Sequence, residues 1–278
     1  MKFTKMHGIG NDYIYVNCFE ETVENASELS IRISDRHFGI GSDGLILICP
    51  SEVADFKMRM FNADGSEGMM CGNGTRCIAK YVYDHGMTDK TRISLETLSG
   101  IKYIDVILGD DGKVANATVD MGEPILTPSK IPVIYDGDTM IDVPVEVNGD
   151  TVRITAVSTG NPHCVVFVDD VHSLDLEKIG PGFENNPIYP NRTNTEFIHV
   201  IDRNTIDFRV WERGSGETLA CGTGACGAVM ACILNNKTED QVLVHLLGGD
   251  LTIRYDRTTN HLFMTGPAAE ICTGDYPA

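Results

Sequence analysis

The 278-residue sequence lacks any run of about 18 apolar residues, the length that a membrane-crossing helix needs. Its first residues, MKFTKMHGIGND, also lack the apolar stretch of a secretory signal peptide. Basic residues are few, since 22 Lys and Arg stand against 40 Asp and Glu, and the formal net charge is −18. A charge of this sign repels nucleic acid and anionic membranes. We therefore expect a protein that binds neither, with a small molecule as its partner.

The cysteines do not indicate a secreted disulfide framework, because nine is an odd number. A reducing compartment fits better, and we expect a cytoplasmic protein. Neither Cys71 with Cys77 nor Cys221 with Cys226 has the two-residue spacing usual in zinc sites. Phosphate-loop spacing and a lysine suited to a Schiff base are also lacking, so we expect no metal and no cofactor. Four cysteines in apolar or turn-like stretches are expected to be small core residues: Cys49, Cys164, Cys232 and Cys272.

An internal repeat at an offset of 150 residues organises the chain. It aligns the CGNG segment at Cys71 with the CGTG segment at Cys221. The same offset matches Arg59 with Arg209, Phe61 with Trp211, Glu67 with Glu217, and Gly10-Asn11 with Gly160-Asn161. We predict two duplicated, pseudo-twofold-related domains, residues 1–120 and 121–266. The tail, residues 267–278, is expected to return to the first domain.

Each copy is predicted to contain strands followed by one helix. Apolar and polar residues alternate over residues 56–60 and 206–210, as in half-buried strands. The helices are expected to begin at the two CGxG segments and to end near Tyr83 and Leu234. The second helix is small or apolar on every side, which predicts a buried helix wrapped by a sheet. Asn148-Gly149 predicts a two-residue hairpin turn. The predicted fold class is α+β.

The CGxG segments are also the strongest chemical signal. A glycine at a strand-to-helix junction lets backbone N–H groups approach a ligand, and the helix N-terminus adds partial positive charge. A cysteine just before such a junction is expected to have a lowered thiol pKa. Cys71 and Cys221 share this placement, although either alone could equally be a structural cysteine beside a helix cap.

Duplication gives the two cysteines a joint role. Pseudo-twofold symmetry would place them on opposite sides of one ligand, and epimerisation needs one group to remove a proton and another to return one to the opposite face. The negative charge that develops on the substrate carboxylate needs fixed donors. Backbone N–H groups at the two helix starts are the candidates: Gly72, Asn73, Gly74, Gly222, Thr223 and Gly224.

Six segments make the chain resemble the diaminopimelate epimerase family along nearly its full length: GIGND (8–12), FNADGSE (61–67), CGNGTRC (71–77), GNPHC (160–164), RTNTEF (192–197) and ERGSGETLACGTGAC (212–226). The resemblance implies two strand-rich, barrel-like domains, each around a central helix. It implies interconversion of LL- and meso-2,6-diaminopimelate without a cofactor, in lysine and peptidoglycan-precursor biosynthesis. It also implies a homodimer.

The resemblance assigns roles to single residues. Cys71 and Cys221 would be the acid and base, while His163 and Glu212 would set their protonation. The end of the substrate that is not inverted would be held by Asn11, Asn62, Asn161, Asn194 and Arg213, and Glu212 would also contact the substrate. An arginine suits a bidentate grip on a carboxylate. Taken alone, Asn11, Asn62 and Asn194 could instead bond their own backbone in turn-rich stretches, and His163 could be structural.

Alternatives remain open at this point. A proline or hydroxyproline racemase, or a phenazine-pathway-type isomerase, would share the duplicated fold. A binding protein acting as a thiol redox sensor could instead form a disulfide between Cys71 and Cys221. The paired cysteines disfavour the isomerase. The RTNTEF and ERGSGET segments disfavour a substrate without a second amino-acid end.

Overall fold

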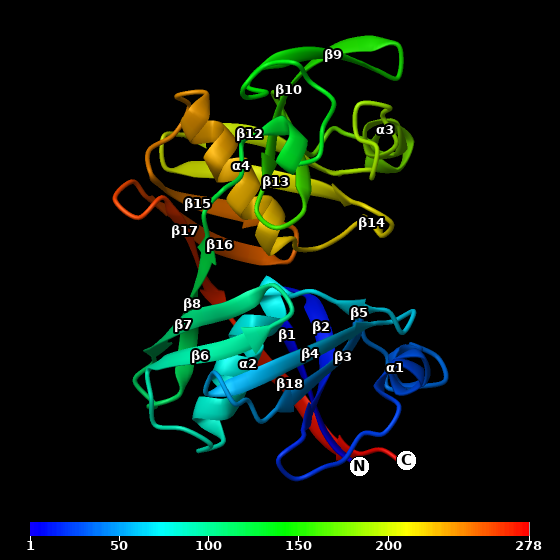
Figure 1. Cartoon of the computed structure of the whole chain (residues 1–278), viewed down its shortest axis with the longest axis vertical. Coiled ribbons are helices and arrows are strands. Elements are labelled where there is room, and N and C mark those ends of the chain that lie inside the picture. The colour runs from blue at the N-terminus through cyan, green and yellow to red at the C-terminus, as the bar shows by residue number, and fades with distance from the viewer. Residues whose placement is uncertain (278) are drawn as a thin grey trace. The chain divides into compact units, whose positions relative to one another are not determined.

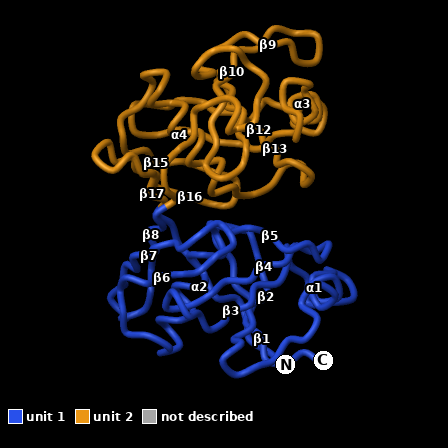
Figure 2. The backbone as a smooth tube through the Cα atoms, viewed as in Figure 1, with its two compact units in different colours: residues 1–120, 265–278 blue, residues 121–264 orange. Residues whose placement is uncertain are grey.

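The computed structural model describes residues 1–277, so Ala278, the last residue of the expected tail, lies outside the described residues. The chain divides into two compact units (Figures 1 and 2). Unit 1 contains residues 1–120 together with the chain from Thr265 onward, and unit 2 contains Met121–Met264. In residues 1–277 no helix is long and apolar enough to cross a membrane.

Unit 1 is built mainly of strands. Its helices are α1 (Ala26–Ser34) and α2 (Gly72–Asp84). Its strands are β1 (Lys2–Gly8), β2 (Asn11–Asn17), β3 (Gly44–Cys49), β4 (Phe56–Asn62), β5 (Glu67–Gly68), β6 (Arg92–Thr97), β7 (Gly100–Leu108), β8 (Val114–Gly122), which runs into unit 2, and β18 (Ala269–Asp275).

Unit 2 is also built mainly of strands, with two α-helices. Its α-helices are α3 (Leu176–Glu184) and α4 (Gly222–Leu234), and a short 3₁₀ helix covers Pro128–Lys130. Its strands are β9 (Val143–Val147), β10 (Asp150–Ser158), β11 (Pro162–Phe167), β12 (Asn194–Asp202), β13 (Thr205–Glu212), β14 (Gly216–Glu217), β15 (Gln241–Leu246), β16 (Gly249–Asp256) and β17 (His261–Pro267), whose end belongs to unit 1.

Strand pairing is the same in the two units. In unit 1, β1 pairs antiparallel with β2, β2 parallel with β3, β3 antiparallel with β4, and β4 parallel with β6. In unit 2, β10, β11, β12, β13 and β15 follow the same sequence of directions. The predicted α+β class and the duplication are therefore confirmed.

An outer strand completes each sheet at the same place. β9 pairs antiparallel with β10 and directly precedes it in the chain. In unit 1 the equivalent strand is β18, which pairs antiparallel with β1. The two strands are more than 260 residues apart in the sequence. The chain after Pro267 thus supplies the neighbour that protects the backbone groups of β1.

The two predicted helices are confirmed, and they begin at the CGxG segments. Helix α2 ends at Asp84, one residue past the expected position, and α4 ends at Leu234. Residues 224–232 of α4 are all buried, and the helix packs against β10, β11, β12 and β16. A helix that is apolar on every side requires this surrounding sheet.

The prediction of one helix per copy was wrong, because each unit has a second one. Helix α3 was missed because Gly180, Pro181 and Gly182 are helix-breaking residues. Both glycines allow close packing: a Cβ on Gly180 would lie 2.3 Å from the Trp211 ring, and one on Gly182 would lie 1.8 Å from the Asn148 side chain. Tertiary packing therefore outweighs the low helix propensity.

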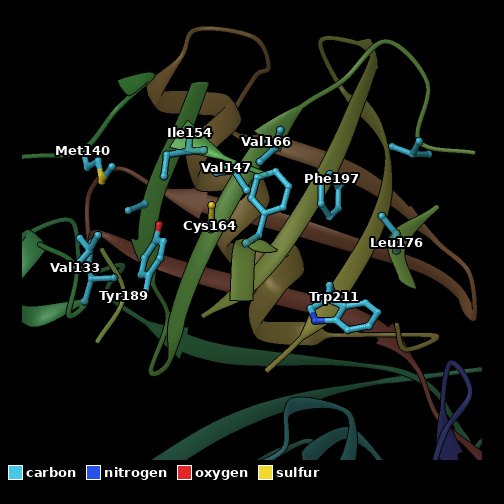
Figure 3. Close-up of a cluster of buried hydrophobic side chains, with 14 residues drawn as sticks. Val133, Met140, Val147, Ile154, Cys164, Val166, Leu176, Tyr189, Phe197 and Trp211 are labelled. Carbon is cyan, nitrogen blue, oxygen red and sulfur yellow. The ribbon is translucent and has the colours of Figure 1, made fainter. Parts of the chain in front are cut away.

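These second helices bury separate cores. Helix α1 packs Leu29 and Ile33 on residues of β2, β3 and β4. Helix α3 contributes Leu176 and Phe183 to a larger core in unit 2 (Figure 3). In that core, the Phe183 and Phe197 rings meet edge to face at 5.2 Å.

Two local predictions have opposite outcomes. Asn148 and Gly149 form the two-residue turn between β9 and β10, with φ of 57° and 91°, so the hairpin is confirmed. The expected core position of Cys272 is wrong, because its side chain is exposed on β18. Cys164 and Cys232 are buried, and Cys49 is half-buried.

Gly44 gives a direct test of strand packing. A Cβ there would lie 2.1 Å from the Phe61 carbonyl oxygen. We expect Gly44→Ala to lower the free energy of unfolding by about 1–3 kcal/mol, because the backbone of β4 has to move. The matched control is Gly109→Ala, whose nearest contact would be a flexible Asp111 oxygen at 3.2 Å, with an effect within about 0.5 kcal/mol. Urea denaturation followed by circular dichroism measures both, and equal midpoints would contradict the packing argument.

Candidate active site

Cys71 is the N-cap residue of α2. Its backbone is extended, with φ −127° and ψ 116°, and its sulfur accepts the Gly74 N–H at 3.3 Å. A Cβ on residue 74 would lie 2.5 Å from Cδ1 of Ile46. Glycine at position 74 therefore lets the helix start lie close to β3 while its N–H reaches the sulfur.

Cys221 occupies the same position in unit 2. Its backbone has φ −124° and ψ 107°, and its sulfur accepts the Gly224 N–H at 3.3 Å. The Thr223 hydroxyl lies 3.5 Å from the same sulfur. A Cβ on residue 224 would lie 2.7 Å from Glu196 Oε1, so this helix start approaches a carboxylate rather than an apolar side chain.

A chain of amide groups surrounds Cys71. Asn11 Oδ1 accepts from the Cys71 thiol at 3.3 Å and from Asn73 Nδ2 at 3.3 Å. Asn11 Nδ2 donates to Asp43 Oδ2 at 2.7 Å, which fixes the orientation of the amide. Asn73 Oδ1 in turn accepts from Arg76 Nη2 at 3.0 Å. The structure thus brings the predicted residues Asn11, Cys71 and Asn73 together.

Two members of this network were missed from the sequence. Arg76 is fully buried, and its Nε donates to the Pro267 carbonyl at 3.2 Å. Asp43 pairs with Arg36 at 2.9 Å. Arg76 lies within the CGNGTRC segment, but only the contacts of Arg76 and Asp43 show that they hold Asn73 and Asn11 in place.

Asn62 stands apart from the Cys71 network. It ends β4, and its Nδ2 donates to Ser66 Oγ at 3.0 Å. By internal alignment its counterpart is Glu212, which ends β13 and accepts a hydrogen bond from Thr218 Oγ1. The two units therefore present an amide and a carboxylate at equivalent strand ends.

A fully buried pair of titratable groups lies beside α4. His163 Nδ1 is 2.7 Å from Glu196 Oε1, and His163 Nε2 is 2.9 Å from Asn161 Oδ1. Both the His163 and Glu196 side chains have no exposed surface. A Cβ on Gly227 would lie 3.3 Å from His163 Cβ, so a glycine again allows the close approach. Asn161 and His163 are thus brought together as predicted, and Glu196 is an additional member.

Glu196 is the most important residue that the sequence analysis missed. Burial raises the pKa of its carboxyl group, while His163 lowers it. Its second oxygen, Oε2, has no hydrogen-bond partner within the part of the chain that the structure describes. The sequence offers little signal for it, because Thr195, Phe197 and Ile198 around it do not show that the carboxylate would be fully buried and paired.

Asn194 and Arg213 meet at the start of β12. Asn194 Nδ2 donates to the Pro162 carbonyl at 2.9 Å, and its Oδ1 accepts the Arg213 N–H at 3.0 Å. Arg213 Nη1 donates to the Asn191 carbonyl at 3.0 Å. The next residue in the chain, Gly214, donates its N–H to Glu184 Oε1 at 2.9 Å. This loop therefore presents the guanidinium in a fixed position.

The expectation of a lowered thiol pKa is wrong for Cys221. Burial raises its pKa well above the ordinary value, and the Glu212 and Glu196 carboxylates raise it further. Hydrogen bonds from Thr223 and the Gly224 N–H lower it, as expected at a helix start, but they are outweighed. Burial and the two carboxylates therefore favour the thiol form of Cys221.

The charge on Glu212 gives a test of this explanation. In a Cys71→Ala background, Glu212→Gln removes one repulsive charge and should shift the pH dependence of Cys221 alkylation to lower pH. At a fixed, mildly alkaline pH the alkylation should become several-fold faster, because the thiolate is the reactive form. Mass spectrometry after timed iodoacetamide treatment measures the rate.

Glu239→Gln is the matched control, since this exposed carboxylate of unit 2 pairs with Arg203. Its pH profile should equal that of the parent. An unchanged profile in Glu212→Gln would show that Glu212 does not act on Cys221.

Comparisons with known proteins concern the chain as a whole. A sequence model described as diaminopimelate epimerase matches residues 3–127 and 155–271. Among curated relatives, a diaminopimelate epimerase of Agathobacter rectalis is 61% identical over 99% of each chain. That of Acetivibrio thermocellus is 58% identical over 99% of this chain and 98% of the relative, and one of Methanococcus maripaludis is 53% identical over 99% of each.

Solved structures share the fold at low sequence identity. A Bacillus anthracis phenazine biosynthesis protein of the PhzF family has a TM-score of 0.71 and 17% identity, covering 100% of this chain and 99% of its own. A hydroxyproline epimerase from Agrobacterium vitis has a TM-score of 0.71 and 13% identity, covering 99% and 90%. These similarities concern the fold, whereas the full-length sequence matches decide the family: the chain belongs to the diaminopimelate epimerase family.

Proposed function

We propose that the protein interconverts LL- and meso-2,6-diaminopimelate by moving a proton at one α-carbon, without a cofactor, in lysine and peptidoglycan-precursor biosynthesis. The observation that carries the proposal is the full-length identity with relatives of that name. The sequence matches favour this substrate over proline or hydroxyproline, and over a thiol redox sensor. The low-identity neighbours support the shared fold alone.

Two thiols carry the proton transfer in this proposal. A thiolate at one cysteine takes the α-proton, and the thiol of the other gives a proton to the opposite face of the carbon. Reversal exchanges the two roles. The support is that Cys71 and Cys221 have the same N-cap geometry and the same sulfur contact with a glycine N–H. The proposal requires both thiols to reach one α-carbon.

The helix starts are proposed to stabilise the intermediate. Removal of the α-proton shifts negative charge to the substrate carboxylate, and fixed donors in place before the reaction lower the barrier. The Gly74 and Gly224 N–H groups point to the cysteine sulfurs. The N–H groups at positions 72 and 73, and at 222 and 223, belong to the same first turns and are the proposed donors to the carboxylate.

The polar residues near the cysteines have distinct proposed tasks. His163 and Glu212 set the protonation of the catalytic groups, and Glu196 positions the His163 ring through its 2.7 Å contact. Arg213 binds the distal carboxylate of the substrate. The amides of the predicted binding set complete its recognition: Asn11, Asn62, Asn161 and Asn194.

We further propose a cytoplasmic homodimer. The family resemblance supports the dimer. The odd number of cysteines supports a reducing compartment.

Solvent deuterium incorporation tests the two-thiol mechanism. In D₂O the wild-type protein should label one α-carbon of diaminopimelate while it interconverts the stereoisomers. Cys71→Ala and Cys221→Ala should each reduce interconversion by at least about 100-fold, because each removes one proton-transfer group. Proton NMR of the α-position and separation of the stereoisomers provide the two measurements.

Cys272→Ala is the matched control, since it removes an exposed thiol of β18. It should keep wild-type turnover. Full interconversion in either Cys71→Ala or Cys221→Ala would overturn the mechanism. No labelling of diaminopimelate by the wild type, with labelling of proline or hydroxyproline, would overturn the substrate.

Arg213 tests recognition of the distal end. Arg213→Ala should raise KM for diaminopimelate by about 10- to 100-fold, which corresponds to the loss of charged hydrogen bonds to a carboxylate. The fall in kcat should be smaller, because the reacting carbon is at the other end. Arg203→Ala is the control, since Arg203 pairs with Glu239 on the surface. An unchanged KM in Arg213→Ala would remove this residue from the binding site.

A further inference from the structure

Two cysteines outside the candidate active site lie side by side on neighbouring strands. β2 and β3 pair in parallel, with Asn17 opposite Ile48. Cys18 directly follows β2, and its N–H donates to the Ile48 carbonyl at 2.9 Å, which continues the pairing by one residue. Cys49 is the last residue of β3. Matching positions on paired strands project to the same face of a sheet.

The two side chains lie close enough to interact with each other, and both pack against the same core of unit 1. Both residues are partly exposed and neither is in a disulfide. Neighbouring strands lie about 4.7–4.9 Å apart, which is inside the range of about 4.4–6.8 Å between the Cα atoms of a disulfide. A bond between the sulfurs therefore needs only a rotation of the side chains.

The charges around the pair give the two thiols different pKa values. The neighbouring Cys18 side chain lowers the pKa of the Cys49 thiol, and the Arg59 and Lys57 cations of β4 lower it further. Glu67, which pairs with Arg59 at 2.8 Å, and partial burial oppose this effect. Cys49 raises the pKa of the Cys18 thiol. Cys49 also lies directly opposite Lys57 on β4, and we assign it as the nucleophile of the pair because a nearby cation favours the reactive thiolate.

The pair is separate from the catalytic cysteines. Asn11, which bonds Cys71, begins β2, whereas Cys18 follows the opposite end of that strand. At the internal offset, Cys18 and Cys49 correspond to Val168 and His199, so unit 2 has no such pair. Nothing in the proposed proton transfer uses these thiols.

We propose that Cys18 and Cys49 form a reversible thiol–disulfide site that reacts with low-molecular-weight disulfides. The Cys49 thiolate attacks one sulfur of the small disulfide, forms a mixed disulfide and expels one thiolate. Cys18 then loses its proton and attacks the Cys49 sulfur, which expels the second thiolate. The two protein thiols are oxidised to one disulfide, and the small disulfide is reduced to two thiols. The product links β2 to β3 and closes the segment that contains α1.

Glutathione disulfide is the probe for the full chain. After timed incubation, free thiols are blocked with N-ethylmaleimide, and tryptic peptides are analysed by mass spectrometry. Cleavage after Arg32, Arg36 and Lys57 places Cys18 and Cys49 in different peptides with one cysteine each. The wild type should yield the two peptides joined by a disulfide, and dithiothreitol should separate them.

Single variants test the order of attack. Cys18→Ser should stop at a glutathione adduct on Cys49. Cys49→Ser should form an adduct on Cys18 several-fold more slowly than Cys18→Ser forms one on Cys49, because Lys57 lies opposite Cys49 and favours the thiolate of that residue. Cys272→Ser is the control, and it should form the Cys18–Cys49 bond at the wild-type rate.

Two results would overturn the proposal. One is a wild-type protein that carries glutathione on Cys272 or Cys49 without forming the linked peptide. The other is equal adduct rates in Cys18→Ser and Cys49→Ser. Since neither thiol takes part in proton transfer, these results are independent of whether the protein epimerises diaminopimelate.

Discussion

A backbone N–H from the third residue of a helix, directed at a cysteine sulfur, is the contact on which both halves of the candidate site depend. It occurs at 3.3 Å between Gly74 and Cys71 and at 3.3 Å between Gly224 and Cys221. Glycine suits both positions, because a Cβ there would displace the Ile46 side chain of β3 in one unit and the Glu196 side chain of β12 in the other. The strands, the helix start and the sulfur are therefore fixed by a single close approach in each unit.

The two units share a fold but differ in the side chains that surround the two cysteines. Ile46 and Glu196 are equivalent at the internal offset, and Tyr13 is the counterpart of His163. Unit 2 thus buries a histidine and a carboxylate where unit 1 has a tyrosine and an isoleucine. A buried pair of this kind costs desolvation energy, so it is weak evidence for a gain in stability. Its place beside Cys221 instead agrees with a role in the chemistry of one cysteine.

The sequence predicts the secondary structure and the duplication better than the pKa values of the candidate site. The CGxG repeat indicated both central helices, and Asn148-Gly149 indicated its hairpin, because these signals are local. Helix α3 was missed because its stability comes from Trp211 and Asn148 packing on its glycines. The raised pKa of Cys221 was also missed, since burial and the carboxylates of β12 and β13 come from residues distant in sequence. Cys272 was misplaced because apolar neighbours in sequence do not show which strands have a free face.

The position of β18 has a consequence for how the chain folds during synthesis. Residues 121–264, which make up unit 2, leave the ribosome before β18 does, so this unit can fold before unit 1 is complete. Unit 1 begins first but has to wait for β18, because β1 lacks its outer neighbour until then. The usual N-terminal-first order is thus inverted here, with an inserted unit completed inside one that remains open.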